Sequence, residues 1–152
     1  MEDPHNLERF IEAQRADYER ALAEIRSGRK RSHWMWYIFP QIEGLGFSAM
    51  SQRYAVRSTA EARAYLEDPV LGARLRTCAE ALVSLEGRSV EEIFGFPDDQ
   101  KLRSCATLFG AVSPAGSVFH RLLQKYFQGE WDPKTIEKIK AEGEEHDSRL
   151  FG

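Results

Sequence analysis

The chain concentrates its aromatic side chains in the stretch Ser32-His33-Trp34-Met35-Trp36-Tyr37-Ile38-Phe39-Pro40-Gln41, which holds two of its three tryptophans. Ser32 can cap a helix, and Pro40 pushes the residue before it out of the helical region of backbone space. We therefore predict a short buried helix here. Large rings with polar tips also suit a dry cavity with a few aimed hydrogen-bonding groups, so this stretch is the first candidate for a site.

The overall composition is that of an ordinary globular protein. Its 152 residues, 42% hydrophobic and 30% charged, are enough to bury a core without disulfides or metal ions. No apolar run approaches the ~18 residues that a membrane span needs, and the N-terminus lacks the features of a secretory signal. Cys78 and Cys105 fall within apolar helical patterns, which favours reduced, buried thiols. We expect a cytoplasmic protein with one domain over residues 1–152.

Helical signals recur along the whole chain. Apolar residues repeat at intervals of three and four from Leu7 to Ile25, and Gly28 follows as a stop signal. Later helix starts are marked by Ser48, Ser58, Asp68-Pro69, Ser89 and Asp132-Pro133. No alternating pattern bounded by turn residues indicates a strand. We predict an all-α fold, a single irregular multihelical domain of six to nine helices, whose last ten or so residues fray.

A helix through the aromatic stretch would divide its side chains between two faces. One face would carry Pro40 and the polar-tipped rings of His33, Trp36 and Tyr37, and the other would carry plain core residues. The first face could hold a planar ligand. The alternative is that the ring tips bond only to neighbouring backbone, which also satisfies burial.

A glycine-rich loop follows the aromatic stretch. Gly44-Leu45-Gly46-Phe47-Ser48-Ala49 fits the spacing of a dinucleotide-binding loop, but that motif works between a strand and a helix, and no strand precedes it. The N–H groups of Gly44 and Gly46 could still approach a ligand, and the helix after Ser48 could meet an anion. The alternative is an ordinary turn followed by a helix cap.

The start of the helix after Pro97 is the third candidate. Asp98 and Asp99 have an adequate explanation as carboxylates that stabilise a helix N-terminus. Lys101 sits at the boundary of the predicted core, where an ammonium group usually has a carboxylate or a ligand phosphate as its partner. The alternative is that its side chain extends to solvent.

Other chemistries find little support. The four histidines and two cysteines do not occur at metal-ligand spacing, so we expect no metal and no cofactor. The net charge of -3 argues against nonspecific nucleic-acid binding. The basic run from Arg26 to Arg31, next to aromatic residues, is the local exception.

The motif from His33 to Gln41 resembles the domain-of-unknown-function 1810 family, a mainly helical bacterial family whose members are sometimes mislabelled calpastatin. The resemblance continues through Gly44-Leu45-Gly46, Pro69 to Leu75, Ile93-Phe94-Gly95 and Pro97 to Leu102, and covers most of the chain. It implies a multihelical domain and brings no activity or cofactor. The calpastatin label has no weight, because that kind of inhibitor is an extended, poorly ordered chain.

Our leading hypothesis is that these three stretches meet around one pocket for a small, planar, anionic, nucleotide-like ligand. Trp36, Tyr37 and Gln41 would line it, Gly44, Gly46, Ser48 and Lys101 would meet the anion, and His33 with Asp98 would be the acid/base pair of any reaction. A second hypothesis is a protein interaction module that uses exposed helix faces such as residues 130–145. A third is nucleic-acid binding through Arg26–Arg31.

Overall fold

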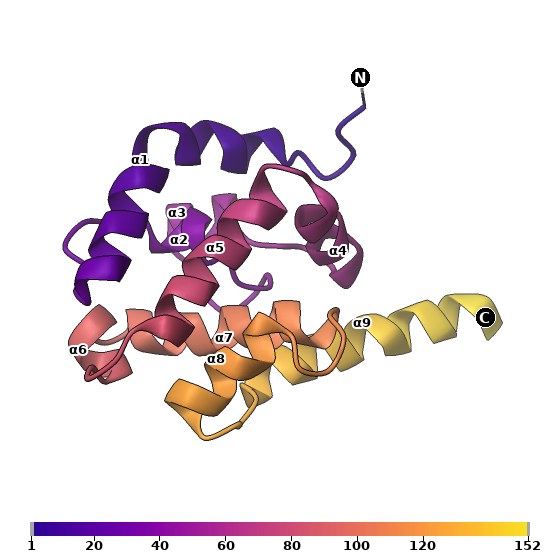
Figure 1. Cartoon of the computed structure of the whole chain (residues 1–152). Coiled ribbons are helices and arrows are strands. Elements are labelled where there is room, and N and C mark those ends of the chain that lie inside the picture. The colour runs from indigo at the N-terminus through magenta and orange to yellow at the C-terminus, as the bar shows by residue number, and fades with distance from the viewer. Residues whose placement is uncertain (1, 152) are drawn as a thin grey trace.

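The structure, a computed structural model, describes residues 2–151 and gives side chains for residues 2–143. Nine helices form this part of the chain (Figure 1). They are α1 (Glu8–Ser27), α2 (Met35–Ile38), α3 (Ala49–Arg53), α4 (Thr59–Glu67), α5 (Leu71–Ser84), α6 (Val90–Phe94), α7 (Asp98–Ala111), α8 (Val118–Phe127) and α9 (Pro133–Phe151). The predicted all-α class and number of helices are confirmed. We expected the last ten or so residues to fray, and the side chains of nearly all of these residues lie outside the described part of the chain.

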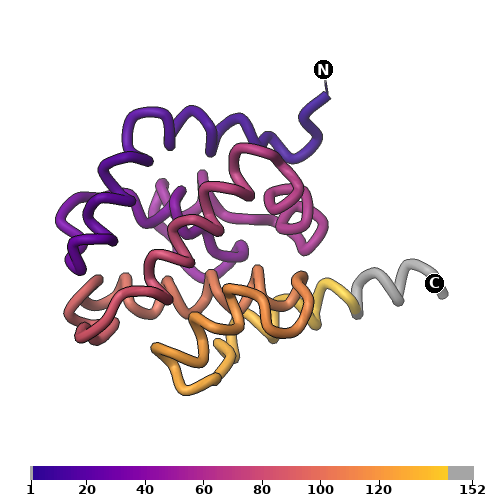
Figure 2. The backbone as a smooth tube through the Cα atoms, viewed as in Figure 1, coloured from indigo at the N-terminus to yellow at the C-terminus, as the bar shows by residue number. Residues whose placement is uncertain are grey.

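The central helix of the array is α5, which packs against α1, α4 and α8. A second group forms around α7, which contacts α4, α6, α8 and the beginning of α9. Figure 2 shows α1 and α4 in the upper part of the view and α6 to α9 in the lower part, with α5 running between them and α2 and α3 behind it. Over the described residues, none of the helices combines the length and apolar character that a membrane span requires.

At most of the predicted helix starts, a side chain caps the first turn of the helix. Ser58 accepts the backbone N–H of Glu61, and Ser89 and Glu92 bond reciprocally across the first turn of α6. Gly28 ends α1 in the left-handed conformation with φ 82°. These caps satisfy backbone groups that the helix itself cannot pair, which is why the sequence pattern located the helices well.

The helix predicted in the aromatic stretch is shorter than its pattern suggests. Only Met35–Ile38 is helical, and Ser32 does not cap it, because the Ser32 hydroxyl donates to Glu24 of α1. Trp34 and Phe39 are buried on either side of α2, and both rings contact Phe94 at the end of α6. The stretch is therefore mainly core, which agrees with the prediction of a buried segment but not with two separate faces.

Glu24 holds the chain that leads into α2. Its carboxylate accepts the backbone N–H groups of Arg31 at 2.7 Å and Ser32 at 3.0 Å, and the indole N–H of Trp34 at 2.9 Å. Burial raises the pKa of Glu24, but the hydrogen bonds from Ser32, Arg31 and Trp34 outweigh burial and lower the pKa to about 2. Sequence analysis gave no hint of this role.

We expect Glu24 to stabilise the fold above pH 4.5 and to lose this contribution as the pH falls towards 2. The sign follows from the lowered pKa, because the folded state favours the charged carboxylate and protonation removes that preference. Glu24→Gln should lower the free energy of unfolding at pH 7 by about 2–3 kcal/mol, since charge-assisted hydrogen bonds are lost. Urea unfolding of both proteins from pH 7 to 2.5 measures the difference, which should shrink in acid; a constant difference would contradict the assignment.

Candidate functional site

The structure contains a cavity of about 560 Å³ where three segments meet. They are the loop after α2, the first turns of α7 and the start of α9. Its lining residues are Gln41, Leu45, Gly46, Pro97, Gln100, Lys101, Ser104, Asp132, Pro133 and Lys134. Cavities that bind small molecules commonly enclose roughly 300–1,000 Å³. The loop and the start of α7 were predicted to meet, and the structure places Gln41, Gly46 and Lys101 on this one cavity.

The loop wall is held in place by backbone hydrogen bonds and by close packing. The N–H of Val56 donates to the carbonyl of Gln41, and the N–H of Glu43 donates to Val56, both at 2.8 Å. A side chain at Gly46 would come within 2.7 Å of the Ser51 hydroxyl. Gly44, with φ 96°, lies against the side chain of Lys138 in α9. The glycines thus let the loop lie close to α3 and α9.

The α9 wall is fixed by Asp132. One carboxylate oxygen accepts the N–H of Thr135 at 3.0 Å, its hydroxyl at 2.5 Å and the Ser104 hydroxyl at 3.2 Å. The backbone N–H of Asp132 donates to the hydroxyl of Thr107, at 2.9 Å. Thr107 and Thr135 are fully buried. The sequence marked Asp132-Pro133 as a helix start, but nothing in it indicated that this start completes a cavity.

A chain of charged groups reaches the cavity from the interior. The Asp98 carboxylate lies between two ammonium groups, 2.9 Å from Nζ of Lys30 and 3.4 Å from Nζ of Lys101. The three side chains are only 8%, 19% and 23% exposed, in the order Lys30, Asp98, Lys101. Each ammonium also lies over an indole ring, Lys30 at 5.1 Å from Trp34 and Lys101 at 5.5 Å from Trp36.

The charges around the cavity do not cancel. The charged residues that line it are Lys101, Lys134 and Asp132, and behind them Lys30 is paired with Asp98. One positive charge is left over, although the whole chain carries a net charge of -3. Lys101 is largely removed from water whereas Lys134 is exposed, so solvent screens part of this excess and the remainder favours an anion in the cavity.

Several predicted site residues lie elsewhere. Tyr37 is buried and its hydroxyl donates to Asp17 on α1, and burial together with this bond raises the pKa of Tyr37. Tyr37 is therefore not among the residues that line this cavity. Ser48 is exposed and caps α3 by accepting the N–H of Ser51. Trp36 is half-buried under Lys101 and does not itself line the cavity.

The proposed acid/base pair finds no support in the geometry. His33 is exposed and does not line the cavity, because it lies before α2 and outside the loop that forms the wall. Asp98 is held by its two lysines and also lies behind the cavity surface. Among the residues with described side chains, no group of three or more metal-binding side chains is close enough to hold an ion.

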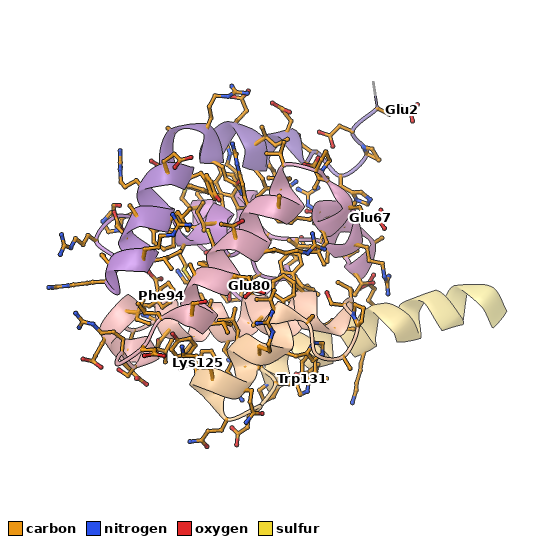
Figure 3. All side chains as sticks on the ribbon, viewed as in Figure 1. Glu2, Glu67, Glu80, Phe94, Lys125 and Trp131 are labelled. Atoms are coloured by element: carbon orange, nitrogen blue, oxygen red, sulfur yellow. The ribbon has the colours of Figure 1, made fainter. Side chains whose placement is uncertain are left out.

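The basic run Arg26–Arg31 is only partly a surface feature. Lys30 points inward to Asp98, and its backbone N–H donates to Ile93. Arg26 borders a second, more open hollow of about 570 Å³ between α1 and α5. There Glu80, labelled in Figure 3, is paired with Arg121 of α8, and Arg76 donates to the carbonyl of Leu66. The charges of this hollow are therefore mostly engaged within the protein.

Comparison with known proteins identifies relatives without a known activity. The sequence model of a family described as protein of unknown function (DUF1810) matches residues 4–139, a range that contains every residue lining the cavity. The crystal structure of the conserved hypothetical protein Rv1873 from Mycobacterium tuberculosis is similar, with a TM-score of 0.89 and 46% sequence identity. The match covers 91% of this chain and 99% of that chain. No curated protein matches the chain.

Proposed function

The chain belongs to this family of proteins of unknown function, and from that premise we propose that it binds a small, planar, anionic molecule, nucleotide-like in shape, in the cavity between the loop, α7 and α9. The observation that carries the proposal is the excess positive charge at a cavity of about 560 Å³. A bound anion would offset this excess by pairing with the ammonium groups of Lys101 and Lys134, which line the cavity.

The lining residues divide by chemistry. Lys101 and Lys134 offer ammonium groups to the anionic part of the ligand. The amides of Gln41 and Gln100 can donate and accept hydrogen bonds, which fits a ligand with polar atoms along a ring edge. Leu45, Pro97 and Pro133 supply apolar surface for the flat part of such a molecule.

We propose binding rather than catalysis as the role of this cavity. The Ser104 hydroxyl is engaged with the carbonyl of Gln100 and with Asp132, and the Asp132 carboxylate caps α9. Neither is arranged as a nucleophile beside a free base. Cys78 and Cys105 are free and buried, and burial raises the pKa of the Cys78 thiol to about 12, which suits an inert thiol in the reducing cytoplasm.

A thermal-shift screen of nucleotides, sugar phosphates and nicotinamide-containing metabolites tests the proposal. A ligand at ~100 times its dissociation constant should add about 2.7 kcal/mol of stability, which for a chain of this size raises Tm by roughly 5–10 °C. Lys134→Ala should weaken binding about tenfold or more, because it removes an ammonium that lines the cavity. Lys101→Met, which keeps an unbranched apolar side chain over Trp36, should do the same.

Lys140→Ala is the matched control, because Lys140 is an exposed lysine of α9 that does not line the cavity. The Lys140→Ala protein should bind each hit with the same affinity as the unmodified protein. The proposal fails if no anion in the screen stabilises the protein, or if hits bind the Lys134 and Lys101 variants unchanged.

A further inference from the structure

Two phenylalanines next to the cavity are far more exposed than any other large apolar side chain in the described part of the chain. Phe47 is 82% exposed and Phe96 is 85% exposed. Burying a phenylalanine side chain stabilises a fold, and these two residues do not gain that stabilisation within the chain itself. Of the large apolar residues described, only Val70 and Trp131 are also exposed, at 38% and 37%.

Both phenylalanines adjoin the same cavity although they are far apart in sequence. Phe47 follows Gly46 and Phe96 precedes Pro97, and Gly46 and Pro97 both line the cavity. Each phenylalanine is therefore bonded to a residue of the cavity wall, although neither side chain is part of the lining itself. Phe47 stands on the loop side and Phe96 on the α7 side.

The backbone at both positions is anchored. The side-chain amide of Gln52 donates to the carbonyl of Phe47 at 2.7 Å. Around Phe96, the N–H of Asp99 donates to Gly95 at 2.9 Å and that of Gln100 donates to Pro97 at 3.0 Å. A ring on a fixed backbone has only two side-chain torsions to order when it binds a partner, so the entropic cost is small.

The other two exposed residues differ. Trp131 precedes Asp132, but its ring packs on Gly110 and meets His120 of α8 edge-on, so one side is covered by the protein; Figure 3 places it between α8 and α9. Val70 lies at the start of α5, and its chain neighbours do not line the cavity. Among the described residues, Phe47 and Phe96 are therefore the two strongly exposed rings that directly adjoin residues of the cavity wall.

We propose that Phe47 and Phe96 form an aromatic rim that binds the ring of the ligand, so that the natural ligand class is a ring-bearing phosphate such as a mononucleotide rather than a sugar phosphate. This inference rests on the proposed function, in which the lysines bind the anion. It adds a second recognition element: stacking of a base on an aromatic side chain is worth about 1–3 kcal/mol, or roughly fivefold to a hundredfold in affinity.

The test compares ligands that share a phosphate and differ in the ring. Inorganic phosphate, ribose 5-phosphate, AMP, GMP, CMP and UMP are titrated by calorimetry into the unmodified protein, Phe47→Ala/Phe96→Ala and Val70→Ala. At least one mononucleotide should bind ten or more times more tightly than ribose 5-phosphate. The double variant should bring that ratio below about three while affinity for ribose 5-phosphate is unchanged, and Val70→Ala should leave every affinity unchanged.

The outcomes separate the two proposals. One outcome is that ribose 5-phosphate binds, that its binding requires Lys134, and that no mononucleotide binds more tightly. The proposal of an aromatic rim is then wrong, and the proposed anion site is supported. The same holds if the mononucleotide preference survives in the double variant. If none of the six ligands binds, both the proposed anion site and the proposed aromatic rim are wrong. Circular dichroism and thermal unfolding establish that the variants fold, which exposed positions should permit.

Discussion

Replacing Arg9 by methionine is expected to lower the free energy of unfolding by about 3–5 kcal/mol, the typical effect of removing one partner of a buried ion pair. Arg9 and Glu61 form a 2.7 Å ion pair whose side chains are 8% and 3% exposed. The guanidinium also donates to four backbone carbonyls, those of His5, Asn6, Arg53 and Ala55. One side chain thus joins the N-terminal segment, α4 and the chain before it.

Urea unfolding followed by tryptophan fluorescence measures this effect. Arg15→Met is the matched control, because Arg15 pairs with the exposed Glu8 and Glu12 and its own side chain is 67% exposed. It should cost under about 0.5 kcal/mol. Arg9→Met/Glu61→Leu should recover part of the loss, since the unpaired carboxylate is removed. Equal effects of the Arg9 and Arg15 substitutions would show that the pair contributes little.

Asp98→Asn is expected to have opposite effects on stability and on binding. Removing the carboxylate leaves Lys30 and Lys101 close together with nothing between them to balance their charge. Since these side chains are largely buried, the free energy of unfolding should fall by about 2–4 kcal/mol. The excess charge at the cavity rises from one to two, so a bound anion should gain affinity by several-fold.

The experiment pairs unfolding with calorimetry. Stability is measured with and without the mononucleotide that binds best, and Lys30→Met/Asp98→Asn serves as the control because it returns the excess charge to one. That double variant should bind the anion about as well as the unmodified protein. Weaker anion binding by Asp98→Asn would mean that Asp98 positions Lys101, and that the excess charge is not what attracts the ligand.

Much of the helical architecture could be predicted because residues close together in the sequence determine where many of the helices begin and end. Ser89 with Glu92, Asp132 with Pro133 and Gly28 act within one turn of the chain, so their patterns identify helix ends without knowledge of the fold. The length of α2 could not be predicted this way. Ser32 bonds to Glu24, a residue of another helix, and this tertiary contact replaces the cap that the sequence suggested.

The candidate site was accessible to sequence analysis only in part. Gln41, Gly46 and Lys101 stood out because polar and glycine residues interrupt apolar patterns there. The sequence did not indicate that the Lys30 side chain points inward, because the side chains of a basic run normally point to solvent and its partner Asp98 is distant in sequence. The contribution of Lys134 depends on the packing of α9 against α7, which no local pattern records.

The order of the cavity walls along the chain affects when the site can form during synthesis. The loop at residues 41–46 leaves the ribosome first of the three walls, α7 follows, and Asp132 to Lys134 come last. A nascent chain stopped before α9 would lack one complete wall and the Asp132 bonds that pin it to α7. A ligand that contacts all three walls could therefore bind fully only after α9 has been synthesised and has packed against α7.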